Sequence, residues 1–479
     1  MREISPTDGL CARSLNCFIM TAMQILLKFQ HASMRVRVLL AVLLAILLAI
    51  GVYYIPPVHE RLAWRIDSLR TRIIYFLNPP DQAVFQPTEQ AMLETIVAQT
   101  MQAYQTPRPP TKTATPRPGP SATPTITSTP LPATAILEGI KYENQQGGPY
   151  NYCGPANFSM ALTFWGWNGN RDVIGKAIMP GNTNQQGKFV DKDKNVMPYE
   201  LQDYIAENVP NISSLIRYGG NMDLLKRMIA AGFPVLVEKG IYEIDLNGKY
   251  SWMGHYAFVT GYDDTAQEFI YQDSYRPAGA PPGHNRRISY EEFIEGWRAF
   301  NYVFVVVYPY EREAQVLTLL GNWADDDWAT RHALEVAQAE SSELTGIDEY
   351  YAWFNKGTSH VALFEYADAT VAYDYAFSLY ADLSGDKSLR PYRMMWYQTG
   401  PYKAYFYSGR YADVINLATT TLEDTISKPN LEESLYWRAR AESMAGDTEA
   451  AIADYRAALK IHPNWETALQ ALQDLGVVP

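Results

Sequence analysis

Residues 105–135 are rich in proline, threonine and serine. A segment of this composition cannot bury a core, and its prolines keep it extended and semi-stiff. Linkers of this kind commonly hold a domain away from a cell surface. Because such a segment does not belong to a folded unit, we expect the chain to fold as separate parts on either side of it.

On the N-terminal side, residues 38–55 form an apolar run without a charged side chain. Its length suits a membrane-spanning helix, and Tyr53 and Tyr54 stand where an interface belt would lie. A cleavable signal peptide is the alternative, but no clear small-x-small cleavage site follows. We predict a single-pass membrane helix after an N-terminal segment of residues 1–37. Arginines flank the run almost equally, so charge does not fix the orientation of the helix. The linker instead favours C-terminal domains outside the cytoplasm.

Residues 56–104 form the predicted juxtamembrane helical segment. An amphipathic, arginine-bearing stretch near Leu62–Phe76 fits a helix lying on the membrane surface, and a short solvated helix is the alternative. A second helix is predicted from Thr88 to Tyr104.

Beyond the linker, a lone cysteine stands at the start of a predicted helix. The apolar residues that follow have the spacing of one buried helical face; they are Phe158, Ala161, Leu162 and Trp165. Pro155 fits the first helical turn and Gly166 fits the end. Cys153 therefore lies at the helix N-terminus, where unpaired N–H groups favour a thiolate, the form that acts as a nucleophile.

The cysteine count adds to this interpretation. Cys11 and Cys17 precede the apolar run, so Cys153 has no intrachain disulfide partner on its own side of the membrane. An exported domain usually pairs or loses a thiol that serves no purpose. A small buried hydrophobic side chain remains the alternative reading of Cys153.

A histidine and an aspartate follow in a predicted hairpin. Residues 254–274 read as strand, turn and strand with Asp263 and Asp264 in the turn. A turn centred on residue 264 places His255 directly opposite Asp273, on the same face. The carboxylate would then hold the imidazole tautomer while the other ring nitrogen takes the thiol proton. The alternatives are that His255 is a core histidine with satisfied hydrogen bonds and that Asp273 only forms a turn.

Two glutamines, Gln145 and Gln146, precede the cysteine by eight and seven residues. A side-chain amide from either one would join the Cys153 backbone N–H in an oxyanion hole. Glutamine is also ordinary in loops.

These motifs together resemble the papain-like cysteine peptidases of the bacteriocin-processing type, and more closely their stand-alone C39-like relatives in bacterial surface proteins. The shared pattern is a glutamine, then Asn-x-Cys-Gly-Pro-Ala opening an apolar helix, then Gly-His-Tyr-x-x-Val-x-Gly, then Asp-Ser. The resemblance covers roughly residues 138–310 and implies an α+β domain at 136–312, with an N-terminal helix packed on an antiparallel sheet.

The resemblance also implies a role for each motif residue. Cys153 corresponds to the nucleophile, His255 to the general base and acid, and Asp273 to the orienting residue. Either Gln145 or Gln146 corresponds to the oxyanion glutamine, because Gly147-Gly148-Pro149 lengthens the gap to the cysteine. No transporter domain follows, so the export-coupled role of the namesake peptidases is not implied.

Local patterns within residues 136–312 predict further elements. We expect a helix from Asn221 to Ala231, a strand from Val235, a capped helix from Ser289 to Trp297 and a buried strand from Tyr302 to Tyr308. A polar, glycine-containing loop is predicted at residues 182–195.

Residues 313–479 read as helices throughout. Two residue sets recur with the same spacings, 82 positions apart: Gly357, Ala369, Tyr373 and Ala376, then Ala439, Ala451, Tyr455 and Ala458. The spacings match a tetratricopeptide helix pair, and Tyr397–Thr421 resembles a degenerate middle copy. We predict about three such repeats, with an additional helical pair at 315–340. Their concave face would bind a protein partner or brace the neighbouring domain.

Other chemistries find no support. A net charge of −12 and a pI near 5.2 argue against a nucleic-acid partner. The sequence has no Cys-x-x-Cys, no His-Glu-x-x-His and no phosphate-binding glycine-rich loop, so we expect no metal and no cofactor. His284, in a Pro/Gly loop, is expected at the surface.

The sequence therefore predicts a membrane-anchored, extracytoplasmic cysteine peptidase or amide hydrolase that acts on a peptide or protein substrate. One alternative is an inactive papain-like binding module that serves as a surface scaffold. Another is transglutaminase-like acyl transfer, because those folds use cysteine, histidine and aspartate in the same order.

Overall fold

The computed structural model describes residues 33–88, parts of 91–98, and 130–146, 151–180, 194–245, 248–276, 282–383, 389–425 and 431–478. The chain forms two compact units, Met1–Asp67 and Ser68–Pro479. Helix α3, Pro56–Leu77, extends across the boundary between them.

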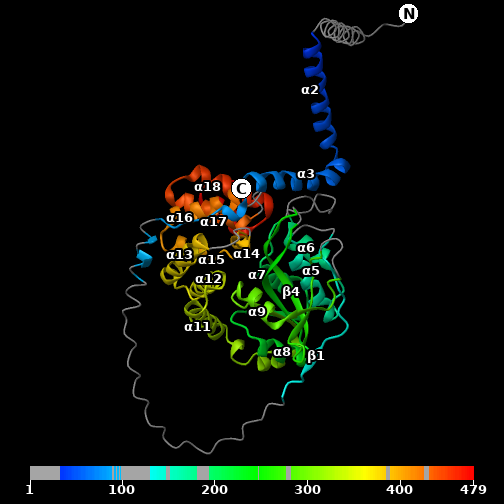
Figure 1. The fold of residues 1–479 in the computed structure, drawn as a ribbon, viewed down its shortest axis with the longest axis vertical. Helices are drawn as coiled ribbons and strands as arrows, with labels where there is room; N and C mark the ends of the chain where they lie inside the picture. The colour runs from blue at the N-terminus through cyan, green and yellow to red at the C-terminus, as the bar shows by residue number, and fades with distance from the viewer. Residues whose placement is uncertain are drawn as a thin grey trace, which may run out of the picture. The chain divides into compact units, whose positions relative to one another are not determined.

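The first unit contains the apolar helix α2, Met34–Tyr53, drawn in blue in Figure 1. It begins four residues before the predicted run because Ser33 caps it, with its side chain accepting from the Val36 N–H. Among the described residues, this is the helix long and apolar enough to cross a membrane, and a signal sequence would have the same properties.

In the second unit, the described residues form one antiparallel sheet of seven strands (Figure 1). The strand order is β2-β7-β3-β4-β5-β6, and β1 pairs with β4. The strands are β1 Thr134–Ile136, β2 Ile212–Arg217, β3 Val235–Ile244, β4 Tyr250–Asp263, β5 Glu268–Gln272, β6 Arg286–Ser289 and β7 Phe304–Pro309.

Helices cover this sheet on both faces, because successive strand residues point to opposite sides. Helices α5 Cys153–Phe164, α6 Arg171–Ile178 and α7 Pro198–Asn208 pack in one core with Leu236 and Phe258. Helices α8 Met222–Ala230, α9 Tyr290–Arg298 and α10 Glu313–Leu320 pack in the other core with Val237 and Val259. An N-terminal helix packed on an antiparallel sheet was predicted, and this part of the fold is confirmed.

The predicted helix starts are confirmed in detail. The Asn221 side chain caps α8 by accepting from the Leu224 N–H at 2.8 Å, and Ser289 caps α9. Strand β7 begins at Phe304 rather than at the predicted Tyr302, because Asn301 and Tyr302 adopt positive φ angles near 50° that no strand accommodates. Residues 182–193 of the predicted loop at 182–195 lie outside the described residues.

The predicted register of the β4–β5 hairpin is wrong. Strand β4 continues through Asp263, whose carboxylate then accepts from the backbone N–H groups of the turn at residues 264–267. The turn is therefore centred beyond residue 264. The pairing also shifts at a bulge between Val259 and Gly261, because one extra residue is inserted in β4.

The displaced turn moves the two predicted site residues apart along the ladder. Phe258 pairs with Gln272, the last residue of β5, so Asp273 follows the strand and does not lie directly opposite His255. The two residues are one diagonal step apart, a separation that side chains still bridge.

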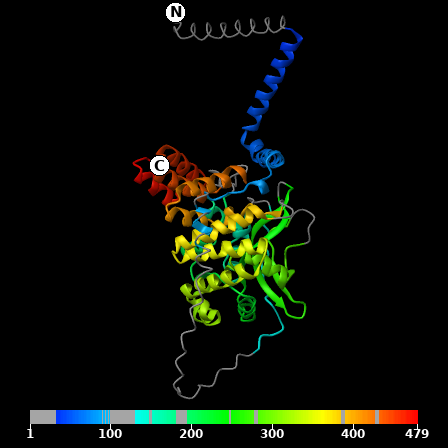
Figure 2. The ribbon, with the colours of Figure 1, turned by 60° about the vertical axis from the view of Figure 1, so that its left-hand side comes forward.

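The C-terminal part is helical, and consecutive helices pack side by side next to the sheet (Figure 2). Its helices are α11 Asp326–Glu343, α12 Ile347–Ala362, α13 Tyr366–Asp382, α14 Met394–Tyr397, α15 Gly400–Tyr407, α16 Tyr411–Thr419, α17 Glu432–Ala445, α18 Thr448–Ile461 and α19 Glu466–Asp474. The recurring small residues lie at helix contacts. A Cβ at Gly357 would come within 2.7 Å of the Tyr373 ring, and Ala369 and Ala376 are fully buried.

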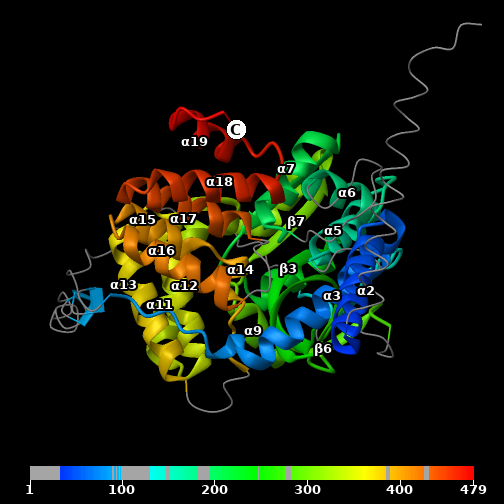
Figure 3. The ribbon, with the colours of Figure 1, turned by 90° about the horizontal axis from the view of Figure 1, so that it is seen from above.

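Residues after α3 also pack on these helices, as the blue segment in Figure 3 shows. Phe85 contacts Phe377 with ring centroids 5.0 Å apart, and Thr95 donates to Asp374 at 2.9 Å. Within α3 itself, Tyr75 donates to the Thr425 carbonyl. The sequence did not predict these contacts, because they join residues that lie hundreds of positions apart.

Candidate active site

Cys153 is the first residue of α5 and is half-buried. No side chain caps the start of this helix, so its first N–H groups and the positive end of its dipole lie at the sulfur. Pro155 is in the first turn, as predicted. Cys11 and Cys17 lie outside the described residues.

A buried asparagine fixes the start of α5 against the sheet. The Asn157 side-chain amide donates to the Cys153 carbonyl at 2.9 Å, to the Tyr256 carbonyl at 3.0 Å and to the Ser274 hydroxyl at 3.0 Å. One side chain therefore connects the cysteine helix, the histidine strand and the segment after β5. Sequence reasoning missed Asn157, although a polar residue within an apolar helix, four positions after the cysteine, was the available signal.

His255 and Asp273 meet despite the wrong register prediction. The His255 Nε2 lies 2.9 Å from the Asp273 Oδ1, and each residue is only 3% exposed. With Nε2 taken by the carboxylate, Nδ1 is the nitrogen left for the sulfur. Glycine precedes the histidine because a Cβ at Gly254 would come within 2.6 Å of Phe300 and 2.9 Å of Tyr397.

Asp273 is held by several donors besides the histidine. Its Oδ1 accepts from the Tyr275 N–H at 2.9 Å, and its Oδ2 accepts from Arg286 and Arg276. Burial alone would raise the pKa of this carboxyl, but the hydrogen bond and charge of His255, together with Arg286, lower the pKa to about 2. Asp273 is therefore a carboxylate at any physiological pH.

The electrostatics of His255 follow from its two partners. Burial opposes a charge on the ring, but hydrogen bonds with Asp273 and Cys153 and the charges of both raise the pKa of His255 to about 9. The imidazolium is therefore stable beside the sulfur near neutral pH.

Gln145 and Gln146 differ in burial and in hydrogen-bond partners. Gln145 is 8% exposed, its backbone N–H donates to the Ser274 carbonyl at 2.9 Å, and its Oε1 accepts from the Ser274 hydroxyl at 3.0 Å. Gln146 is exposed, and its carbonyl accepts from Arg171. Since Ser274 also bonds Asn157, Gln145 is the glutamine connected to the cysteine helix. His284 is exposed, as expected.

Two cavities flank strand β3. Glu238 lines one, of about 610 Å³, and the next strand residue, Lys239, lines the other, of about 480 Å³, together with His255 and Asp273. Sequence reasoning missed both charged residues, because a strand so apolar at its start gave no sign of buried charges at its fourth and fifth positions.

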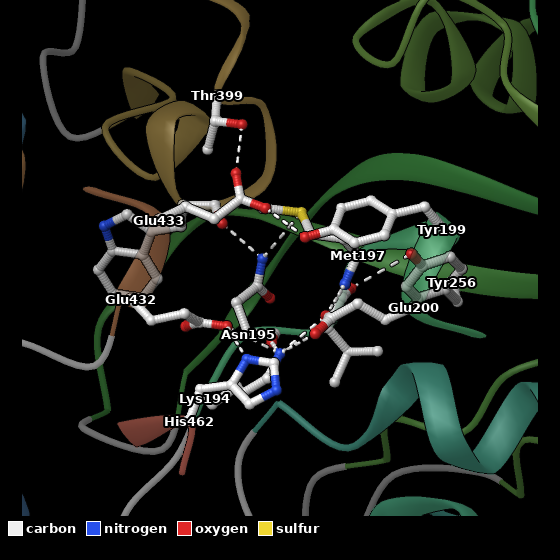
Figure 4. A network of polar contacts seen from close by, with 12 residues as sticks. Lys194, Asn195, Met197, Tyr199, Glu200, Tyr256, Thr399, Glu432, Glu433 and His462 are labelled. Carbon is white, nitrogen blue, oxygen red and sulfur yellow. Dashed lines mark hydrogen bonds and ion pairs between the residues drawn. The ribbon is translucent and has the colours of Figure 1, made fainter. Parts of the chain in front are cut away.

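A second cluster of buried charge joins α7 to α17 (Figure 4). The Lys194 ammonium, which has no exposed side-chain surface, lies 2.6 Å from Glu200 and 2.9 Å from Glu432. Glu200, Glu432 and His462 are close enough to share a metal ion, but the lysine already bonds both carboxylates. The cluster is therefore a closed ion network and not a metal centre.

Comparison with known protein families identifies the domain that holds the cysteine, the histidine and the aspartate. Residues 137–305 match the Peptidase_C39 like family. The match confirms, for this C39-like domain, the resemblance drawn from the sequence motifs. It supports a cysteine peptidase, with a peptide or protein as the substrate class. No curated protein matches the chain.

Solved structures similar to the C39-like domain include three crystal structures. One is described as a C39-like peptidase from Bacillus anthracis (14% identity, 36% of this chain and 97% of that chain, TM-score 0.28). Another is the peptidase domain of Streptococcus ComA, a bi-functional ABC transporter (15%, 36% and 98%, TM-score 0.23). The third is xylellain, a cysteine protease from Xylella fastidiosa (14%, 38% and 87%, TM-score 0.27).

Proposed function

We propose that this chain is a cysteine peptidase whose C39-like domain cleaves peptide or amide bonds with Cys153, His255 and Asp273. The observation that supports this most is the chain of contacts from Asp273 through His255 to a cysteine at a helix N-terminus. The same three residue types in contact are the arrangement that activates a thiol nucleophile.

In the proposed reaction, the Cys153 sulfur attacks the scissile carbonyl and forms a tetrahedral intermediate. Protonated His255 gives its proton to the leaving amine as the carbon–nitrogen bond breaks, which leaves an acyl-enzyme. Neutral His255 then takes a proton from water, whose oxygen attacks the thioester. Collapse of that second intermediate releases the acid and restores the thiolate and the imidazolium.

Gln145 is the proposed side-chain donor of the oxyanion hole, together with the Cys153 backbone N–H. Its Oε1 accepts from Ser274, which orients the amide so that Nε2 is the donating end. Such donors stabilise the negative oxygen of both tetrahedral intermediates. The exposed Gln146 has no comparable support.

The roles of the remaining segments are also proposals. We propose that residues 38–55 anchor the chain in a membrane, that the linker predicted at 105–135 ends before β1, which begins at Thr134, and that the C39-like domain acts outside the cytoplasm. Residues 313–479 are proposed as tetratricopeptide-like repeats that bind a protein partner. The recurring spacings and the close contact of Gly357 with Tyr373 support the repeats.

The test is cleavage of a peptide library by the full chain and by Cys153→Ala, with mass-spectrometric detection of new termini. Cysteine peptidase activity predicts cleavage that disappears in the variant while the protein stays folded. Equal cleavage by both proteins, or none by either, would contradict the proposal. Incorporation of an added amine into a glutamine peptide, without hydrolysis, would instead indicate acyl transfer.

A further inference from the structure

Glu238 is the most unusual charged residue near the proposed nucleophile. It lies on β3 opposite Tyr256 and is 5% exposed, yet it lines the 610 Å³ cavity. Within the part of the chain that the structure describes, no hydrogen bond or ion pair reaches its carboxyl. Buried carboxyls are normally hydrogen-bonded or paired, so a buried carboxyl without a partner calls for an explanation.

The neighbouring charges do not supply that partner. Burial raises the pKa of Glu238 well above its usual range, and the charge of Cys153 adds to this effect while His255 opposes it. The carboxyl is thus close enough to both residues to feel their charges. Lys239, next on the strand, points to the opposite face and feels Glu292 and Asp273 instead.

Other acidic groups on the cavity wall are satisfied. Glu433 accepts from the Tyr199 hydroxyl at 2.6 Å and from the Thr399 hydroxyl, as Figure 4 shows. Glu238 is therefore the carboxyl on this wall that still has acceptor capacity for a ligand. It also lies directly across from Tyr256, whose carbonyl shares the Asn157 amide with the Cys153 carbonyl.

The shape and lining of the cavity narrow down the ligand. Aromatic rings of Tyr218, Phe300 and Tyr397 line it near Glu238, and it continues along the C-terminal helices past Trp437. A volume of about 610 Å³ is within the range of ligand sites in proteins. Aromatic walls with a carboxyl suit a long aliphatic side chain that ends in a cation.

We propose that the Glu238 cavity is a specificity subsite that takes a lysine or arginine side chain of the peptide substrate, at a residue next to the scissile bond. This inference rests on the proposed function, since it identifies the substrate class of the same site. Glu238 is a binding residue here and takes no part in proton transfer. A bound cation would lower the pKa of this carboxyl, so the cationic end would pair with its carboxylate form while the stem lies against the rings.

The expected effect on selectivity follows from the nature of the contact. A hydrogen bond between charged groups in a buried site contributes enough to change kcat/KM by about 10- to 100-fold. Glutamine keeps the shape of the side chain but not its charge. Glu238→Gln should therefore lower the preference for lysine over norleucine by about 10- to 100-fold, while cleavage of the norleucine peptide changes little.

The first experiment measures kcat/KM for peptides that differ only in lysine, arginine, norleucine, glutamine or glutamate at each position flanking the bond that the library identifies. The wild type should prefer the basic residues at one of these positions. The control is Glu243→Gln, the same substitution on the same strand, which should keep that preference. Equal rates for lysine and norleucine, or an unchanged ratio in Glu238→Gln, would overturn the subsite.

The second experiment does not depend on catalysis. Binding of the same blocked peptides is measured by fluorescence polarisation with full-chain Cys153→Ala and with Cys153→Ala/Glu238→Gln. Tighter binding of lysine and arginine peptides to the first protein alone supports the subsite, even if no peptide is cleaved and the peptidase proposal fails. Cysteine-dependent cleavage without a basic preference in either experiment would overturn the subsite and leave the peptidase proposal intact.

Discussion

Two buried groups of charged residues in this protein differ in one respect. In the Lys194 cluster, a fully buried ammonium lies between the carboxyls of Glu200 and Glu432 and bonds both of them. In the Cys153 cluster, His255 and Asp273 are equally buried, but the sulfur at the end is half-buried. The first cluster is closed by its own side chains, while the second still offers a nucleophile.

This difference separates stability from chemistry. A closed ion network lowers the free energy of one arrangement of α7 and α17, since removing its ammonium leaves two buried carboxyls without a counter-charge. In an open cluster such as Cys153, His255 and Asp273, the proposed role of the buried charges is to keep His255 protonated beside the sulfur. The comparison predicts that substitutions in the two clusters affect different measurements.

The largest expected effect is on cleavage in His255→Ala. Loss of the proton donor and acceptor should lower kcat/KM by about 10⁴-fold. The protein should lose the part of its stability that the imidazolium contributes but stay folded, because Asp273 keeps Arg276 and Arg286 as partners. Steady-state kinetics and urea unfolding measure the two effects, and a large loss of stability with activity retained would reverse the comparison.

The opposite pattern is expected for Lys194→Met. Two buried carboxylates lose their counter-charge, so the free energy of unfolding should fall by about 3–5 kcal/mol, while cleavage per folded molecule stays within a few fold. The matched control is the triple variant Lys194→Met/Glu200→Gln/Glu432→Gln, which removes every charge of the network and should recover most of the stability. If the single variant is as stable as the wild type, the network does not hold the two helices.

Asp273→Asn sharpens the electrostatic part of the comparison. The pKa of His255 is raised to about 9, so the imidazolium and the stability it contributes are complete below about pH 6.5 and are lost as the pH rises through about 9. Without the carboxylate this pKa should fall toward 6.5, which moves the alkaline limb of the activity profile to lower pH. We also expect kcat to drop about 10³-fold. A pH–rate profile tests both expectations. An alkaline limb that stays near pH 9 would count against Asp273 as the residue that orients His255 and raises its pKa.

The smallest effect is expected at the glutamines. Gln145→Ala should lower kcat about 10²-fold by removing one oxyanion donor. Gln146→Ala, the matched control one residue away, should behave like the wild type because Gln146 is exposed. Parallel kinetics of the two variants decide the assignment, and the reverse order would transfer the role to Gln146.

The sequence predicted the local elements because their signals are local. The helix at Cys153 and the Asn221 and Ser289 caps follow from spacing and capping residues, and the antiparallel sheet was implied by the family resemblance. The Cys153–His255–Asp273 grouping also came from motifs. The register of the hairpin did not, because the sequence does not show that β4 runs through Asp263 and that the turn lies at residues 264–267.

Contacts between distant residues were the part that sequence reasoning could not reach. Lys194 lies in a polar stretch and looks like a surface residue until α17 brings Glu432 to it. Tyr397 approaches Gly254 from a segment that follows it by more than a hundred positions. Glu238 looks like an ordinary charge after an apolar run. Only the packing of the helices on the sheet shows that these residues are buried together.

The most direct test is the reactivity of Cys153 in the intact, reduced protein near neutral pH. A thiol-directed probe, followed by peptide mapping that separates Cys153 from Cys11 and Cys17, should label Cys153 readily in the wild type and far more slowly in His255→Ala. If Cys153 stays unlabelled in the wild type, or reacts at the same rate in both proteins, the histidine does not activate this sulfur and the peptidase proposal is contradicted.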